Sequence, residues 1–254
     1  LGANSLSAHS SSDAPRVDLG SARYPDKAAA PKSELLFSAP TLEPARYQLT
    51  YVLADASAKD LEAQYQSYAR SVGFSAGTEH RFRWFPPPGC QSDMGCVFQA
   101  LSEEDRAAVL PLVDLFNKRQ KEGHLDTLKL AKLVVGFVQD IRYREPEEEP
   151  FGVLAPALVV SRRQGDCDSK SLLAHIVLNE LGYDTVMLSS DAHRHAMLGV
   201  ALPVPGTKIR YEGRDYAYTE LTAHGAPIGY LFPQNSNPND WRVVPLRRPL
   251  SSHP

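Results

Sequence analysis

The chain has 254 residues, of which 43% are hydrophobic and 22% are charged, and its formal net charge is −3. This balance is typical of a globular protein with one good-sized core, with or without a small extra lobe. The weak net charge implies no broad attraction to nucleic acid, so we expect no nucleic-acid partner. No apolar run reaches the roughly 18 residues that a transmembrane helix needs, so we expect none within these residues.

Residues 1–44 are rich in Ser, Ala and Pro and show neither a helical nor a strand period. We interpret them as a flexible linker or tether that docking on the core can order in part, with a plain disordered tail as the alternative. The sequence begins with Leu and lacks a basic region followed by an apolar stretch, which indicates a processed or truncated chain. A membrane tether, if present, would lie outside the given residues.

The chain has three cysteines, and two of them lie six positions apart within a segment rich in Pro and Gly. The spacing favours a disulfide between Cys90 and Cys96, with two unpaired cysteines as the alternative. A disulfide would place the protein in an extracytoplasmic compartment, either periplasmic or secreted. Cys167 is then the odd cysteine, and it is either a reactive thiol or an inert buried one.

Residues 45–124 are predicted to form strands and helices that flank the core. The alternation in 46–53 predicts a strand, and the apolar spacing in 58–72 predicts a helix. Ser102 and the acidic residues after it resemble a helix N-cap. The remaining expectations are a short strand at 81–85, a strand at 97–101, and a helix from Ser102 to about Glu122 that bends near Pro111.

Residues 125–254 are predicted to form the core, which opens with a broad apolar helix over 125–141. A second buried helix begins at Cys167 and ends before Gly182, a residue suited to a helix C-terminus. The free N–H groups and the dipole of a helix start favour a thiolate and can stabilise an oxyanion. A small buried residue at the start of a core helix is the structural alternative for Cys167.

Two further groups can activate such a thiol. His195 opens a small apolar run that is predicted to be an interior strand, although His193 has the same strand parity. Glu220 alternates with Tyr216 and Tyr218 on the next strand, where a carboxylate can orient a histidine ring. A surface histidine and a glutamate in a salt bridge are the plain alternatives. Together, a thiol, a base and an orienting acid are the parts of an activated nucleophile.

These motifs resemble the transglutaminase-like superfamily, which is related to papain-like cysteine proteases. The resemblance covers roughly residues 125–231 and rests on the Gly165-Asp-Cys-Asp-Ser-Lys run, the His195-Ala-Met strand and the Tyr216-Ala-Tyr-Thr-Glu strand. It implies a catalytic triad of Cys167, His195 and Glu220, where the family more often has Asp as the acid. It also implies an α+β fold in which the cysteine helix packs on an antiparallel sheet that carries His195 and Glu220.

The expected function is a cysteine hydrolase, a peptidase or amidase that acts on a protein or peptide through a thioester. The first alternative is a transglutaminase-type acyltransferase with an amine acceptor, and the second is a catalytically inert binding or scaffold module.

Gln164 is a candidate oxyanion donor. Lys170 is expected to cap or solvate its helix. This chemistry needs neither a cofactor nor a metal, and a metal site of His193, His195 and Cys167 lacks a recognisable ligand spacing.

Overall fold

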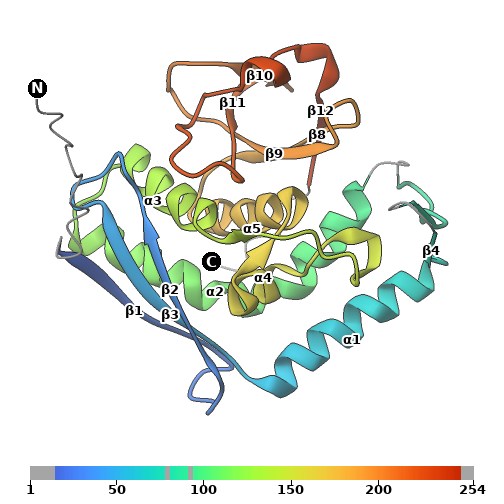
Figure 1. Ribbon diagram of the computed structural model, residues 1–254, viewed down its shortest axis with the longest axis horizontal. Coiled ribbons are helices and arrows are strands. Elements are labelled where there is room, and N and C mark those ends of the chain that lie inside the picture. The colour runs from blue at the N-terminus through green and yellow to red at the C-terminus, as the bar shows by residue number, and fades with distance from the viewer. Residues whose placement is uncertain (1–14, 78–80, 91–93, 247–254) are drawn as a thin grey trace, which may run out of the picture.

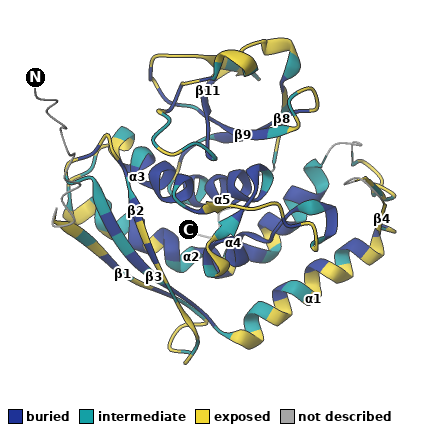
Figure 2. Cartoon of the chain, viewed as in Figure 1, coloured by how far each residue is buried: buried dark blue, intermediate teal, exposed yellow. Residues whose placement is uncertain are grey.

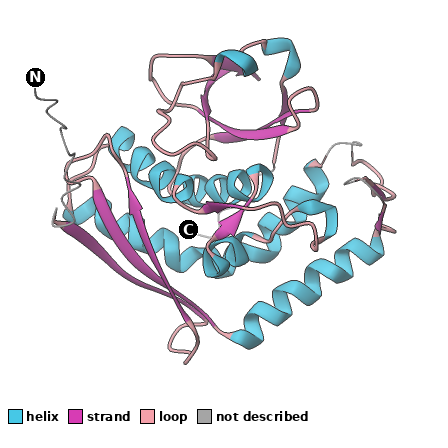
Figure 3. Cartoon of the chain, viewed as in Figure 1, coloured by secondary structure: helices cyan, strands magenta, loops and turns pink. Residues whose placement is uncertain are grey.

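The computed structural model describes residues 15–77, 81–90 and 94–246, and it confirms a mixed α+β fold (Figure 1, Figure 3). A layer of helices lies between two sheets: an N-terminal sheet on one side and a five-stranded C-terminal sheet on the other. Within the described ranges, none of the helices combines the length and the apolar content that a membrane span requires.

The N-terminal sheet has three strands: β1 (Arg16–Tyr24), β2 (Lys32–Ser38) and β3 (Arg46–Leu53). β3 lies in the centre, parallel to β1 and antiparallel to β2. The inner face of the sheet packs on the helical layer and buries Leu19, Leu35 and Phe37. The prediction of a flexible linker is therefore wrong for β1 and β2, while residues 1–14 lie outside the described residues.

Helix α1 (Asp55–Ser71) follows β3 and leads to two short paired strands, β4 (Ser75–Ala76) and β5 (Phe82–Arg83). Cys90 and Cys96 form a disulfide, as the sequence predicts. Helix α2 (Gly95–Glu122) begins at this disulfide and contains Pro111. The strand predicted at 97–101 is wrong, because these residues are helical, and Ser102 is buried inside the same helix and does not cap it.

The helical layer consists of α2, α3 (Thr127–Gln139), α4 (Pro156–Arg162) and α5 (Cys167–Glu180). The segment between α3 and α5 also contains a 3₁₀ turn (Pro150–Gly152) and two short parallel strands, β6 (Arg142–Tyr143) and β7 (Gln164–Gly165). Helix α5 contacts α2, α3, α4 and two strands of the C-terminal sheet, and nearly all of its surface is buried (Figure 2). A helix that is buried on all sides needs apolar residues on all sides, which α5 has from Leu172 to Leu178.

The C-terminal sheet contains β8 (Thr185–Ser190), β9 (His195–Val200), β10 (Lys208–Tyr211), β11 (Arg214–Thr219) and β12 (Arg242–Val244). The strands are antiparallel in the order β10-β11-β9-β8-β12. One face lies on α5. A second apolar cluster around Trp241 covers the other face, so the chain packs back on the sheet there. Two 3₁₀ turns, Pro233–Asn235 and Pro238–Asp240, precede β12.

The predicted domain boundaries do not divide this fold. The boundary at residue 44 falls between β2 and β3 of one sheet, and α2, assigned to the flanking region, packs on α5. All three layers share one continuous apolar core that extends from Leu19 to Val244.

Candidate active site

Cys167 is the first residue of α5, as the sequence predicts. Asp166 caps the helix: its backbone is extended, and its side chain accepts hydrogen bonds from the backbone nitrogen of Ser169 at 3.0 Å and from Ser169 Oγ at 2.5 Å. The preceding Gly165 fits a closely packed position, because a Cβ there would lie 3.2–3.3 Å from the side chains of Ser169 and Val159. The cap and the glycine together fix the helix start, and the Cys167 side chain is 6% exposed.

The charge environment of Cys167 opposes ionisation. Burial raises the pKa of the thiol well above its usual range, and the carboxylates of Asp168 and Asp166 raise it further. Hydrogen bonds from the backbone N–H groups of Ala196 and Asp168 act in the opposite direction but are outweighed. The helix start does supply N–H groups, as expected, but the thiolate that we expected from it is not favoured. The thiol is therefore neutral at physiological pH in this conformation.

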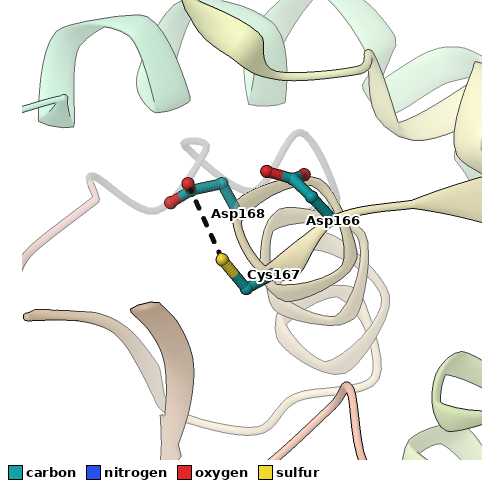
Figure 4. A group of neighbouring side chains, drawn as sticks. All are labelled: Asp166, Cys167 and Asp168. Carbon is teal, nitrogen blue, oxygen red and sulfur yellow. Dashed lines mark hydrogen bonds between the residues drawn. The ribbon is translucent and has the colours of Figure 1, made fainter. Parts of the chain in front are cut away.

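Asp168 is the nearest acidic neighbour of the thiol, with its Oδ2 at 4.0 Å from the Cys167 sulfur. Figure 4 shows the Asp168 carboxylate and the Cys167 sulfur facing one another, with the Asp166 carboxylate beside them at the helix start. Burial and the charge of Asp166 raise the pKa of Asp168 to about 7, although His195 acts to lower it. Asp168 is thus a titratable group that contacts the thiol and lies within electrostatic reach of His195.

His195 is the first residue of β9, and its Nε2 lies 2.8 Å from Glu220 Oε2. Glu220 directly follows β11 and is 2% exposed, and its other oxygen accepts two hydrogen bonds from Thr222, at 2.7 and 2.6 Å. Burial opposes ionisation of Glu220, but its contacts with His195 and Thr222 outweigh burial and lower its pKa. The carboxylate is therefore ionised and fully partnered, and it orients the ring of His195.

The rival histidine, His193, is engaged elsewhere. Its Nε2 lies 3.0 Å from Asp240 Oδ2, and its ring lies 5.9 Å from that of Trp241. Trp241 also contacts the His195 ring edge to face at 6.2 Å, and its indole nitrogen donates to the Asn235 carbonyl. Trp241 therefore separates the two histidines and shields one side of the His195–Glu220 pair.

Cys167 and the His195–Glu220 pair come from different layers of the fold and meet at the start of β9. The backbone N–H of Ala196, the residue after His195, hydrogen-bonds the Cys167 sulfur. Because Glu220 occupies Nε2 of His195, Nδ1 is the ring nitrogen that remains for a proton transfer. The arrangement brings together a thiol from α5, an imidazole from β9 and a carboxylate from the end of β11.

Cys167 lines a cavity of about 600 Å³ that is open to solvent. Asp166, Asp168 and Arg194 line it beside the thiol. The other lining residues include three phenylalanines and four glutamates: Phe74, Phe82, Phe151, Glu145, Glu147, Glu148 and Glu149. Gln164 lines a different cavity with Glu34 and Arg163, so its oxyanion role has no geometric support.

 The four glutamates that line the cavity of Cys167 lie in the segment 145–149, in which Pro146 interrupts the acidic run.

Three groups able to bind a metal lie together at the helix start: the ligand atoms of Asp166, Cys167 and Asp168 are within 4.8 Å of one another. This set differs from His193, His195 and Cys167, which the sequence analysis considered as a metal site and rejected for lack of a recognisable ligand spacing. The Asp166 oxygen that caps α5 already accepts two hydrogen bonds from Ser169. The three residues are consecutive, and their arrangement follows from the helix cap.

Two residues near the site have roles that the sequence did not reveal. Lys170 was expected to cap or solvate its helix, but it is 1% exposed, and its Nζ donates to the carbonyls of Gln139 and Ile141 at 3.3 and 2.7 Å. Gln139 is 6% exposed and hydrogen-bonds the segment that follows β11. The signal for Gln139 is an amide at the end of an otherwise apolar helical stretch from Leu133 to Val138.

Comparison with known proteins gives no family for this chain: no family model, no curated protein and no solved structure matches it.

Proposed function

We propose that the protein is a cysteine hydrolase, a peptidase or amidase, with Cys167 as nucleophile, His195 as base and Glu220 as the orienting acid. The observation that carries the proposal is the part-buried His195–Glu220 hydrogen bond of 2.8 Å, on a strand whose Ala196 N–H bonds a thiol at a helix start. A papain-like or transglutaminase-like core is part of the same proposal. Its support is the helix of Cys167 packed on the antiparallel sheet that holds His195.

The neutral thiol determines how the reaction begins. His195 takes the thiol proton as the sulfur attacks the substrate carbonyl carbon, so the base acts during attack and no thiolate is formed beforehand. The negative charge moves to the carbonyl oxygen, where the backbone N–H of Cys167 at the start of α5 stabilises it. The amine then leaves with the proton from His195. Water, deprotonated by the same ring, cleaves the thioester and releases the acid and the thiol.

The same proposal covers location. The Cys90–Cys96 disulfide is compatible with an oxidising compartment, which supports a periplasmic or secreted protein. It also simplifies the experiment, because Cys167 is the one cysteine outside the disulfide.

The test measures alkylation of Cys167 by iodoacetamide, followed by mass spectrometry of the intact protein over about pH 5 to 9. We expect the wild type to react at least about tenfold faster near pH 7 than the His195→Ala variant, because general-base assistance is typically worth 10² or more. Cys167→Ala is the control for site identity. Slow alkylation that is equal in the wild type and in His195→Ala would overturn the proposal.

A second measurement follows the complete reaction. We expect an activated ester such as p-nitrophenyl acetate to acetylate Cys167 and the wild-type protein to turn over, with loss of turnover in Cys167→Ala and His195→Ala. Added primary amines distinguish hydrolysis from transfer: release of acetate alone supports the hydrolase, whereas an acetylated amine as the main product would contradict it.

A further inference from the structure

The structure contains a hydrogen-bonded connection between the helix that carries Cys167 and the loop that carries Glu220. It consists of Gln139 at the C-terminal end of α3 and Lys170 on α5, one turn after Cys167. Both side chains are buried, and their hydrogen bonds to the described residues go to main-chain atoms. The connection joins three elements that are far apart in sequence.

Gln139 fixes the Glu220 side of the connection. Its Nε2 donates to the carbonyls of Glu220 at 2.8 Å and Ala226 at 2.9 Å, and its Oε1 accepts from the backbone N–H of Gly225 at 3.1 Å. Two carbonyl partners on one end and an N–H partner on the other determine which end of the amide is the nitrogen. The amide thereby holds both ends of the loop between Glu220 and Ala226.

Lys170 fixes the Cys167 side. Its Nζ donates to the carbonyls of Gln139 and Ile141, which belong to the last residue of α3 and the segment just beyond it. The last carbonyls of a helix lack partners within the helix, and the helix dipole favours a cation at this end. Burial lowers the pKa of Lys170 to about 8, although the charges of Glu220 and Asp140 act to raise it.

We propose that Gln139, supported by Lys170, is a positioning residue that sets the Glu220 carboxylate against His195. This inference rests on the proposed function, since it assigns a role within the same site. Neither residue touches the cavity beside Cys167, so each acts through Glu220 and His195. A second contact to the same loop joins His224 Nδ1 to Asp140 Oδ1 at 2.5 Å, at an exposed position. This contact does not involve the main chain of Glu220, which Gln139 holds.

The decisive variant is Gln139→Glu, which keeps the shape of the side chain but replaces its donor with an acceptor. An ionised carboxylate cannot donate to the two carbonyls, so the loop must shift and Glu220 with it. Gln139→Met removes the amide without adding charge and keeps the proposal testable if the charged variant unfolds. Gln120→Glu, at a half-buried position of α2 outside this connection, is the matched control.

The primary readout is the tautomer of His195, measured by NMR of the ring nitrogens in protein labelled with ¹⁵N-histidine. The Cys167→Ala background makes this readout independent of any reaction of the thiol. We expect a fixed Nε2–H tautomer when Gln139 is intact, and a mixture of tautomers in Gln139→Glu and Gln139→Met, as in Glu220→Ala. Gln120→Glu should leave the tautomer fixed.

The secondary readout is the alkylation rate of Cys167 in the background that retains the thiol. We expect Gln139→Glu to slow it about tenfold or more near pH 7, because misplacement of a reacting group by about 1 Å can cost 10² in rate. A fixed tautomer in both folded Gln139 variants would overturn the positioning role. A lost tautomer together with equal alkylation of wild type and His195→Ala would uphold the positioning role and reject the cysteine chemistry.

Discussion

At the scale of single residues, the charges around Cys167 decide how the thiol can be used. Glu220 contacts His195 and in the proposed mechanism acts through it, whereas Asp168 lies 4.0 Å from the sulfur and burial raises its pKa to about 7. Above that pH an ionised Asp168 opposes a thiolate, and below it the opposition fades. The reactivity of Cys167 therefore depends on two acidic groups with opposite effects.

The variant Asp168→Asn tests this account. Two unit charges 4 Å apart repel by about 1 kcal/mol even in bulk water, which corresponds to a factor of roughly five. We expect iodoacetamide to alkylate the variant about fivefold faster than the wild type, or more, at pH 8. The difference should shrink toward pH 5, where the wild-type carboxyl is protonated. Asp215→Asn, at an exposed position on β11, is the control. A slower reaction of Asp168→Asn would show that the carboxylate assists the thiol.

At the scale of elements, the close approach of α3 to the end of β2 keeps Gln139 in place. Gly136 lies where the two meet: a Cβ there would stand 2.7 Å from the Ser38 carbonyl oxygen and 3.0 Å from Ala39. The neighbouring main chain is anchored, because the Ser38 N–H donates to Asp140 Oδ2 at 2.5 Å. The site therefore depends on a contact between two elements that contain none of the candidate triad.

This contact predicts that Gly136→Ala destabilises the protein, although alanine is the better helix former. The gain in helix propensity is about 1 kcal/mol, while overpacking typically costs about 1–3 kcal/mol, and here the clash is with main-chain atoms. We expect a net loss of about 1 kcal/mol in urea unfolding. Gly123→Ala is the control, since its Cβ would meet only the end of the flexible Arg119 side chain. Equal stabilisation by both substitutions would contradict this reading.

Local patterns predicted the elements of the site better than its electrostatics. Asp166 before Cys167 and Gly182 after α5 mark that helix in the sequence, and the apolar run after His195 marks β9. The short apolar run at 97–101 fits a strand or a helix equally well, and only the longer context makes it helical. The burial of Lys170 and the raised pKa of Cys167 arise from segments distant in sequence, which no local pattern contains.

At the scale of the whole molecule, the N-terminal sheet is one wall of the core. Phe37 on β2 is 5% exposed, stacks on Tyr47 at 5.3 Å, and meets Phe137 of α3 edge to face at the same distance. The composition of residues 1–44 obscured this role, because Ser and Pro outnumber the alternating apolar residues. The sheet therefore supports α3 from the face opposite the candidate site.

Two substitutions on neighbouring residues of β2 distinguish a structural wall from a tether. Phe37→Ala should cost about 3–5 kcal/mol of the free energy of unfolding, as for other buried Phe→Ala changes. Leu36→Ala, whose side chain is 59% exposed on the opposite face, should stay within about 0.5 kcal/mol. Chemical denaturation of both variants measures the difference. Small, equal effects would restore the interpretation of this segment as a linker.

The position of Trp241 has a consequence for the order in which the molecule is made. Trp241 covers the His195–Glu220 pair, yet it follows Cys167 by 74 residues. At a synthesis rate of about 5–20 residues per second, roughly 4–15 s pass between the two residues on the ribosome. During that interval the nascent chain carries its free thiol without the indole that shelters His195, so the site cannot be completed until Trp241 has been made.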